Sequence, residues 1–282
     1  CVHLDLLHNH KIPDPFNSNN EKNLQWIGKE DWTYRLLFAP QKTILNKKNK
    51  FICFEGIDTY ADIFLNGEKI LSTNNMFHPW EAEISDIIKD GENELKINFR
   101  SPIKEVSAQM NQLNYQLPAD NDQAEKTSPF TRKAPYHYGW DWGPCFVTSG
   151  IWRKVYLAGW DSWHIRRTSI VNHKVLSNSA QLFLELEILS EVEELASIII
   201  KEPNLGIVFE SSICLMIGSN FIKEKFSIRN PKLWWPAGHG DQFLYHFNVI
   251  INSRKNQIKA SLRTGIRDVS INRKKDEAGT AF

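Results

Sequence analysis

The chain has 282 residues, of which 41% are apolar and 24% are charged, and its formal net charge is +1. This length exceeds the roughly 100–150 residues of an average domain, so the sequence predicts two domains, each with its own core. A footprint for nucleic acid or for an anionic membrane would need clustered excess charge, which this balance does not supply. No apolar run approaches the roughly 18 residues of a membrane span. We therefore expect neither nucleic acid nor a membrane as a partner.

The residues that hold metals and cofactors are scattered along the chain. The four cysteines form no Cys-x-x-Cys pair, and the nine histidines form no group with the three or four ligands that zinc requires. The sequence contains no Gly-x-Gly-x-x-Gly loop, no Walker pattern and no Gly-x-Ser-x-Gly elbow. We expect free thiols, no metal site and no cofactor.

Short apolar runs separated by turn residues fill positions 34–99, as in a β-sandwich. Residues 61–71 predict a hairpin, because Asn66 and Gly67 tolerate the positive φ that both central positions of a type I′ turn need. Residues 94–99 alternate with period two, which places their apolar side chains on one face.

A helix and a long loop are expected next. Apolar residues recur at spacings of three or four over positions 103–114, which predicts at least one helical turn. Residues 115–134 are polar and interrupted by proline, and a structureless loop longer than about 12–15 residues is usually functional or disordered. We favour a functional loop, because it leads directly into the most informative motif of the chain.

That motif is Gly-Trp-Asp-Trp-Gly-Pro at positions 139–144, which places one carboxylate between two indoles. A carboxylate accepts hydrogen bonds from neighbouring hydroxyls, and indole faces cover the apolar C–H patches of a sugar ring. We therefore take Trp140, Asp141 and Trp142 as candidate substrate-binding residues. In extended backbone, however, Trp140 and Trp142 would share one face while Asp141 points to the other, so at least one indole could be a packing residue. The alternative for Asp141 is an Asx-turn residue.

A second series of strands follows. Residues 151–160 predict a strand, the first domain boundary is expected near Asp161, and short alternating segments run from residue 163 to residue 266. Their spacing is typical of an immunoglobulin-like sandwich.

The motif and its surroundings resemble the β-mannosidases of glycoside hydrolase family 2. The matching segments are Val2 to Leu7, Ile12 to Pro15, Asp31 to Tyr34, Arg132 to Tyr138 leading into the hexapeptide, Ser149 to Arg153, Leu233 to Gly238 and Thr264 to Arg267. They extend over nearly the whole chain. Galactosidase and glucuronidase relatives share the Gly-Ile-x-Arg landmark but not the Trp-Asp-Trp-Gly-Pro run.

The resemblance implies an all-β chain in three parts. It implies a jelly-roll-like sugar-binding β-sandwich over residues 1–160, an immunoglobulin-like β-sandwich over residues 161–266, and a link over residues 267–282 to a catalytic (β/α)8 barrel that the chain lacks. Cys1 would lie inside an early strand. Both catalytic glutamates would lie beyond Phe282, so no catalytic residue is assigned within the chain, which alone should be inactive.

The resemblance also implies a function. The intact protein would be a retaining exo-β-mannosidase that removes terminal non-reducing β-D-mannose from an oligosaccharide or glycoconjugate. Asp141 would accept hydrogen bonds from two mannose hydroxyls and complete the pocket of the barrel. Arg132, Lys133, His137 and Tyr138 are weaker candidates for hydroxyl recognition. The alternatives are a non-catalytic carbohydrate-binding or structural sandwich, and a related exo-glycosidase such as a β-glucosaminidase or β-galactosidase.

Overall fold

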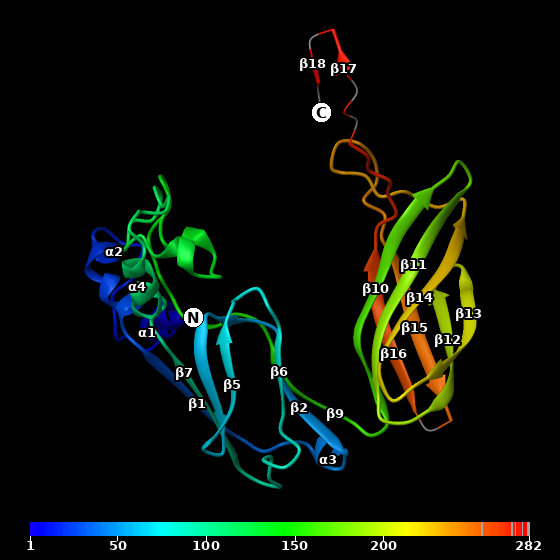
Figure 1. The fold of residues 1–282 in the computed structure, drawn as a ribbon, viewed down its shortest axis with the longest axis horizontal. Helices are drawn as coiled ribbons and strands as arrows, with labels where there is room; N and C mark the ends of the chain where they lie inside the picture. The colour runs from blue at the N-terminus through cyan, green and yellow to red at the C-terminus, as the bar shows by residue number, and fades with distance from the viewer. Residues whose placement is uncertain (255, 272, 274, 278, 281–282) are drawn as a thin grey trace. The chain divides into compact units, whose positions relative to one another are not determined.

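The computed structural model describes residues 1–254, 256–271, 273, 275–277 and 279–280. They divide into two compact units, Cys1–Asp161 and Ser162–Phe282. Figure 1 shows that both units are built mainly of strands, as expected for an all-β protein. Within the described residues, no helix is both long and apolar enough to cross a membrane.

The first unit is an antiparallel sandwich with short helices at its amino-terminal end. Its elements are α1 (Val2–His8), α2 (Asn20–Asn23), η1 (Gln25–Lys29), β1 (Trp32–Phe38), α3 (Lys42–Leu45), β2 (Asn49–Phe54), β3 (Ile57–Asp58), β4 (Tyr60–Leu65), β5 (Glu68–Asn74), β6 (Trp80–Glu83), β7 (Asn93–Phe99), α4 (Pro102–Gln112), η2 (Ser128–Phe130), η3 (Pro135–His137), β8 (Gly150–Ile151) and β9 (Val155–Trp160). One sheet has the order β1-β7-β4-β5 and the other β6-β2-β9, while β3 pairs with β8.

Two local predictions are confirmed in this unit. Strands β4 and β5 form the hairpin, with Asn66 at φ 53° and Gly67 at φ 88° in the turn. Strand β7 alternates as expected, and Leu95, Ile97 and Phe99 are buried in the core between the two sheets. The apolar period of two therefore correctly identified the inward face of a central strand.

Two predictions are wrong. Residues 2–8 form helix α1 instead of part of a strand, because Val2 is buried in a small cluster with Ile12, Leu24 and Ile27 that a helical turn can reach. The strand expected over residues 151–160 is interrupted between β8 and β9. There the Trp152 indole N–H donates to the carbonyl of Met76, and the ring lies against Gly56, where an added Cβ would approach it to 2.4 Å.

The helix predicted over residues 103–114 is confirmed as α4. It begins after Ser101, whose side-chain oxygen accepts a hydrogen bond from the backbone N–H of Lys104, and it buries Ile103 and Val106. Residues 113–127 contain no helix or strand. This loop is nevertheless tied together by the buried Asp122, whose two carboxylate oxygens accept hydrogen bonds from the backbone N–H groups of Ala124 and Ser128.

The second unit is a two-layer antiparallel sandwich. Its strands are β10 (Trp163–Val175), β11 (Ser179–Ser190), β12 (Glu194–Glu202), β13 (Gly206–Leu215), β14 (Gly218–Arg229), β15 (Tyr245–Ser253) and β16 (Gln257–Thr264), followed by the short pair β17 (Lys275–Asp276) and β18 (Gly279–Thr280). The sheets β10-β11-β14 and β13-β12-β15-β16 enclose one apolar core. Seven strands in two sheets of three and four are typical of an immunoglobulin-like domain, as predicted.

Candidate functional site

The Trp-Asp-Trp segment lies at the tip of a small hairpin-like loop. An isolated antiparallel bridge joins Tyr138 to Cys145 at its base. On one side, Gln123 donates from its backbone N–H to the carbonyl of Tyr138 and from its side-chain amide to the carbonyl of Trp140, both at 2.8 Å. On the other side, the backbone N–H of Cys145 donates to the Glu21 carboxylate at 2.7 Å. The tip is therefore held from both sides by the body of the unit.

A glycine is required where this loop departs from its base. Gly139 has φ of 102°, in a region that side chains disfavour, and an added Cβ would lie 3.0 Å from the Gln123 side chain. Gly139 thus lets the chain turn outward while Gln123 stays packed beneath it.

The two indoles contact each other across a closed turn. Trp140 and Gly143 exchange backbone hydrogen bonds of 3.2 and 3.3 Å, so the four residues form a closed turn. The rings of Trp140 and Trp142 meet edge to face, with centroids 5.8 Å apart and planes at 69°. Trp140 is half-buried, whereas Trp142 is 84% exposed. Only Trp140 has the burial of a packing residue.

The two indoles line two shallow hollows. One has a volume of about 450 Å³ and is lined by Asp141 and both indoles together with polar residues that include Ser18, Glu21 and Gln123. The other has a volume of about 540 Å³ and is lined mainly by Tyr136, His137, Phe146 and the two indoles. Volumes of this size accommodate small ligands. The loop thus presents a polar and an aromatic surface side by side.

Asp141 is exposed and makes no hydrogen bond or ion pair with the residues that the structure describes. An Asx-turn residue would accept a hydrogen bond from the backbone two residues on. Here the turn is closed by backbone groups of Trp140 and Gly143 instead. The carboxylate of Asp141 is therefore free to accept hydrogen bonds from a ligand.

The four weaker candidates before the motif have different environments. Arg132 is exposed. Lys133 and Tyr138 are fully buried, and the Tyr138 hydroxyl shares a 2.8 Å hydrogen bond with Thr131. Burial removes Lys133 and Tyr138 from contact with a sugar at this surface. His137 is half-buried and lines the aromatic hollow.

Lys133 belongs to a buried polar cluster that the sequence did not predict. Its ammonium group donates to Asp58 at 2.5 Å and to the carbonyl of Thr148 at 2.6 Å. His137 Nδ1 lies 3.5 Å from the same Asp58 oxygen. Asp58 ends the two-residue strand β3, between Ile57 and Thr59, and no local pattern marks it as a partner of Lys133. Because Thr148 follows the loop and Lys133 precedes it, this cluster holds both ends of the loop.

Burial shifts the pKa values in and around this cluster. Burial and, to a smaller extent, the Lys133 charge together lower the pKa of His137 to about 4, against the opposing effect of Asp58. Burial also lowers the pKa of His3 to about 4, with added effects from Lys133 and His137. The pKa of Lys133 is lowered by burial, although Asp58 counteracts the shift. Both histidines are therefore neutral at neutral pH.

We expect a pH-dependent loss of stability from these histidines. An unfolded histidine has a pKa near 6.5. The folded pKa values are lower, so the unfolded state binds more protons as the pH falls from about 6.5 to about 4, and the folded state becomes less stable. The stabilisation is fully present above pH 6.5. Urea unfolding of the full-length protein between pH 7.5 and pH 4 should show a loss of order 2–3 kcal/mol for each histidine.

A variant pair checks this expectation. His3→Leu should flatten the pH dependence, whereas the same change at the exposed His8 should leave it as it is. An unchanged slope in the His3 variant would show that this residue is not a source of the acid sensitivity.

Comparison with known proteins places both units in one family. The family description "Glycosyl hydrolase 2 galactose-binding domain-like" matches residues 1–153, and "Glycosyl hydrolases family 2" matches residues 163–267. The chain belongs to glycoside hydrolase family 2. Among the described residues of this family member, no group of three or more His, Cys, Asp and Glu could hold a metal ion.

Within this family, the similar proteins include enzymes named β-mannosidase. β-Mannosidase B of Thermothelomyces thermophilus is 32% identical over 287 residues, covering all of this chain and 33% of the relative. The crystal structure of a β-D-mannosidase from Dictyoglomus thermophilum is 37% identical with a TM-score of 0.90, and the match covers all of this chain and 35% of that one. An exo-chitosanase from Amycolatopsis orientalis is 19% identical with a TM-score of 0.74, covering 99% of this chain and 30% of that one, and shares the fold alone. The family 2 chain therefore spans about a third of the length of these relatives.

Proposed function

We propose that this chain is part of a retaining exo-β-mannosidase that hydrolyses terminal non-reducing β-D-mannose residues, and that the loop carrying Trp140, Asp141 and Trp142 supplies substrate contacts. The observation that carries the proposal is an unpartnered, exposed carboxylate beside an indole that is 84% exposed. The carboxylate can accept hydrogen bonds from sugar hydroxyls, and the exposed indole face can cover the apolar C–H patch of a sugar ring. Two relatives named β-mannosidase that match the whole chain support the choice of sugar.

The bond cleavage itself is assigned to another part of the protein. A retaining glycosidase uses one carboxyl group to protonate the leaving oxygen and a second, about 5–5.5 Å away, to attack the anomeric carbon. We place this pair in a catalytic barrel that follows the link over residues 267–282, beyond a sugar-binding domain over residues 1–160 and an immunoglobulin-like domain over residues 161–266. The role of Asp141 is to orient the mannose ring by accepting hydrogen bonds from two of its hydroxyls, because correct orientation lowers the barrier to attack.

The sugar specificity is tested with the full-length protein expressed from its own gene. We expect it to release nitrophenol from the aryl β-mannoside at least about 100-fold faster, in kcat/KM, than from the β-glucosaminide, β-galactoside or β-glucoside. A hydrogen-bonding site that holds the correct hydroxyls rejects the wrong isomer by such factors or more.

Each alternative function gives a different result in the same assay. Faster release from the β-glucosaminide or β-galactoside would replace the proposed substrate by that of a related exo-glycosidase. No release from any glycoside, with sugar binding retained, would favour a non-catalytic carbohydrate-binding sandwich. The anomeric configuration of the mannose that is released first, observed by NMR, tests retention. A retaining enzyme releases β-mannose first, whereas an inverting enzyme would release α-mannose first.

A further inference from the structure

The aromatic hollow beside the Trp-Asp-Trp turn has walls that are held in place by ring contacts. Tyr136 and Phe146 both line it. The Tyr136 ring meets His137 edge to face, with centroids 4.9 Å apart. The Phe146 ring contacts both Phe16 and His3, each at a centroid distance of 5.2 Å. Rings that are already packed in this way lose little freedom when a ligand stacks on them.

The hollow is open to a ligand of the size of one sugar ring. Its volume is about 540 Å³, and the Tyr136 side chain is 64% exposed. Aromatic faces can cover the apolar C–H side of a pyranose ring while the hydroxyls at the rim of that ring stay in water. The lining therefore fits a pyranose better than a charged or strongly polar ligand.

His137 gives this hollow a polar group of defined character. Its side chain is 19% exposed, while its Nδ1 is buried and lies 3.5 Å from the Asp58 carboxylate. A neighbouring carboxylate favours the tautomer that carries the proton on Nδ1. The ring is neutral, because its pKa is lowered to about 4. Nε2 is then a hydrogen-bond acceptor for a hydroxyl in the hollow.

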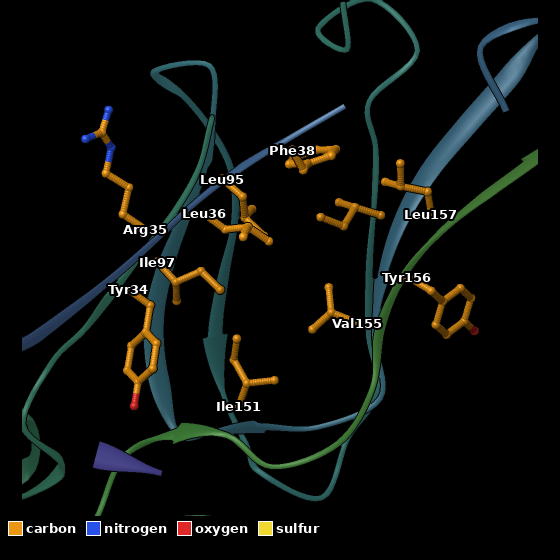
Figure 2. Close-up of a pocket in the computed structure, with 11 residues that line it drawn as sticks. Tyr34, Arg35, Leu36, Phe38, Leu95, Ile97, Ile151, Val155, Tyr156 and Leu157 are labelled. Atoms are coloured by element: carbon orange, nitrogen blue, oxygen red, sulfur yellow. The ribbon is translucent and has the colours of Figure 1, made fainter. Parts of the chain in front are cut away.

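A larger apolar groove in the first unit does not suit a sugar. It lies between side chains of β1 and β7 on one wall and of β2 and β9 on the other (Figure 2). The Tyr34 hydroxyl donates to Asp5, the Arg35 guanidinium pairs with Glu94, and the Tyr156 side chain points away from the groove in Figure 2. These polar groups do not converge on a ligand, as they do in sites for small polar molecules.

The aromatic hollow adjoins the hollow that contains Asp141. Both are lined by Trp140, Trp142, Gly143 and Pro144. A ligand of two rings can therefore extend across this shared turn, with one ring in each hollow.

We propose that the aromatic hollow binds the leaving-group sugar of the substrate, while Asp141 binds the terminal mannose; this inference rests on the proposed exo-β-mannosidase function. Tyr136 and Phe146 cover the C–H face of the leaving sugar, and His137 Nε2 accepts a hydrogen bond from one of its hydroxyls. The bond to be cleaved then lies over the shared turn. The preferred substrates are β-mannosyl oligosaccharides, in preference to mannosides of small alcohols.

The experiment compares two mannosides that differ in their leaving group. The full-length protein is assayed with β-1,4-mannobiose and with methyl β-mannoside, whose methyl group is too small to occupy the aromatic hollow. The readout is the specificity ratio, which is kcat/KM for mannobiose divided by kcat/KM for methyl β-mannoside. Tyr136→Ala should lower this ratio about 10-fold, because the ring area that the sugar would cover corresponds to roughly a factor of ten in an equilibrium constant. Tyr136→Phe should keep the ratio within about twofold, because the ring face makes the contact.

Matched variants identify indirect effects. Tyr115 is 62% exposed and lines a different hollow. Tyr115→Ala should keep the specificity ratio within about twofold. Asp141→Ala should lower kcat/KM for both mannosides by a similar factor, since both place the same mannose beside this carboxylate. A ratio that Tyr136→Ala leaves unchanged, or that Tyr115→Ala lowers as much, would overturn the inference.

Two substitutions of His137 test the hydrogen bond from the leaving sugar. Glutamine places its amide near the position of Nε2, whereas asparagine places it near the position of Nδ1. His137→Asn should therefore lower the specificity ratio by about fivefold, the loss expected for one hydrogen bond, while His137→Gln should keep it within about twofold. Equal ratios in the two variants would remove His137 from the proposed subsite.

Failure of the proposed function gives a different result from failure of this inference. Cleavage of neither mannoside by the full-length protein would overturn the proposed function and the leaving-group subsite together. Cleavage of both mannosides, with a specificity ratio that Tyr136→Ala does not change, would overturn the subsite alone.

Discussion

Replacing Asp141 by alanine in the full-length protein should lower kcat/KM for an aryl β-mannoside by about 100- to 1,000-fold. The proposed carboxylate accepts hydrogen bonds from two hydroxyls, and each hydrogen bond to a charged group is worth roughly 1.5–3 kcal/mol. At the lower end of that range the loss of both bonds removes about 3–4 kcal/mol, which is 100- to 1,000-fold because every 1.4 kcal/mol is a factor of ten. The residue is exposed and without a partner among the described residues, so thermal unfolding should stay unchanged.

Two further variants separate the carboxylate from its surroundings. Asp141→Asn keeps the shape and one acceptor oxygen, so it should retain more activity than the alanine variant. Asp120 is also exposed and lies in the long loop that precedes the motif. Asp120→Ala should leave kcat/KM within about twofold of the unchanged protein. If Asp141→Ala behaved like Asp120→Ala, the proposed role of this loop in substrate binding would be wrong.

Local patterns were sufficient for those parts of the fold that local chemistry determines. Asn66 and Gly67 define their hairpin because few other pairs accept positive φ at both positions. The alternation in β7 and in the second unit reveals the inward faces because a sheet has a period of two. The motif at positions 139–144 was likewise visible in the sequence, since a carboxylate between two indoles is an unusual composition.

Features that depend on distant partners escaped prediction. Helix α1 forms because Val2 packs against residues 10 to 25 positions away, which its own short segment does not reveal. Asp58 and Lys133 meet across 75 positions of sequence, and nothing near Asp58 signals a partner. The Trp140–Gly143 segment closes as a turn whose base is held by Gln123 and Glu21, and the motif itself does not reveal these distant partners.

These distant contacts determine how the candidate site is held. Asp141 belongs to a tip without regular secondary structure, and its position depends on the anchors at the base of the loop. Among these anchors, Lys133 should contribute most to stability, because a charge inside a domain is tolerated only with a partner. Its removal should therefore affect both folding and the loop.

Replacing Lys133 by methionine should destabilise the first unit by about 3–5 kcal/mol. The Lys133 side chain is fully buried and donates to both Asp58 and Thr148, and Asp58 is itself 5% exposed. The variant leaves the Asp58 carboxylate buried with its charge unpaired, which is the costly way to break such a pair. Thermal unfolding of the full-length protein should show this unit melting roughly 10 °C lower. Faster proteolysis between residues 133 and 148 should accompany the loss, because the lysine no longer joins the two ends of the loop.

Two comparisons identify the cause as an unpaired buried charge. Lys29 contacts Glu125 at the same 2.5 Å, but both side chains are about half exposed, so Lys29→Met should cost less than about 1 kcal/mol. Adding Asp58→Asn to Lys133→Met removes the stranded charge and should recover at least about 1.5 kcal/mol of the loss. Equal costs for the two lysine variants, or a double variant no more stable than Lys133→Met, would mean that the buried pair does not hold the loop through its charge. The stability of the loop would then depend on the hydrogen bonds of Gln123 and Glu21 and on packing around Tyr138 and Cys145.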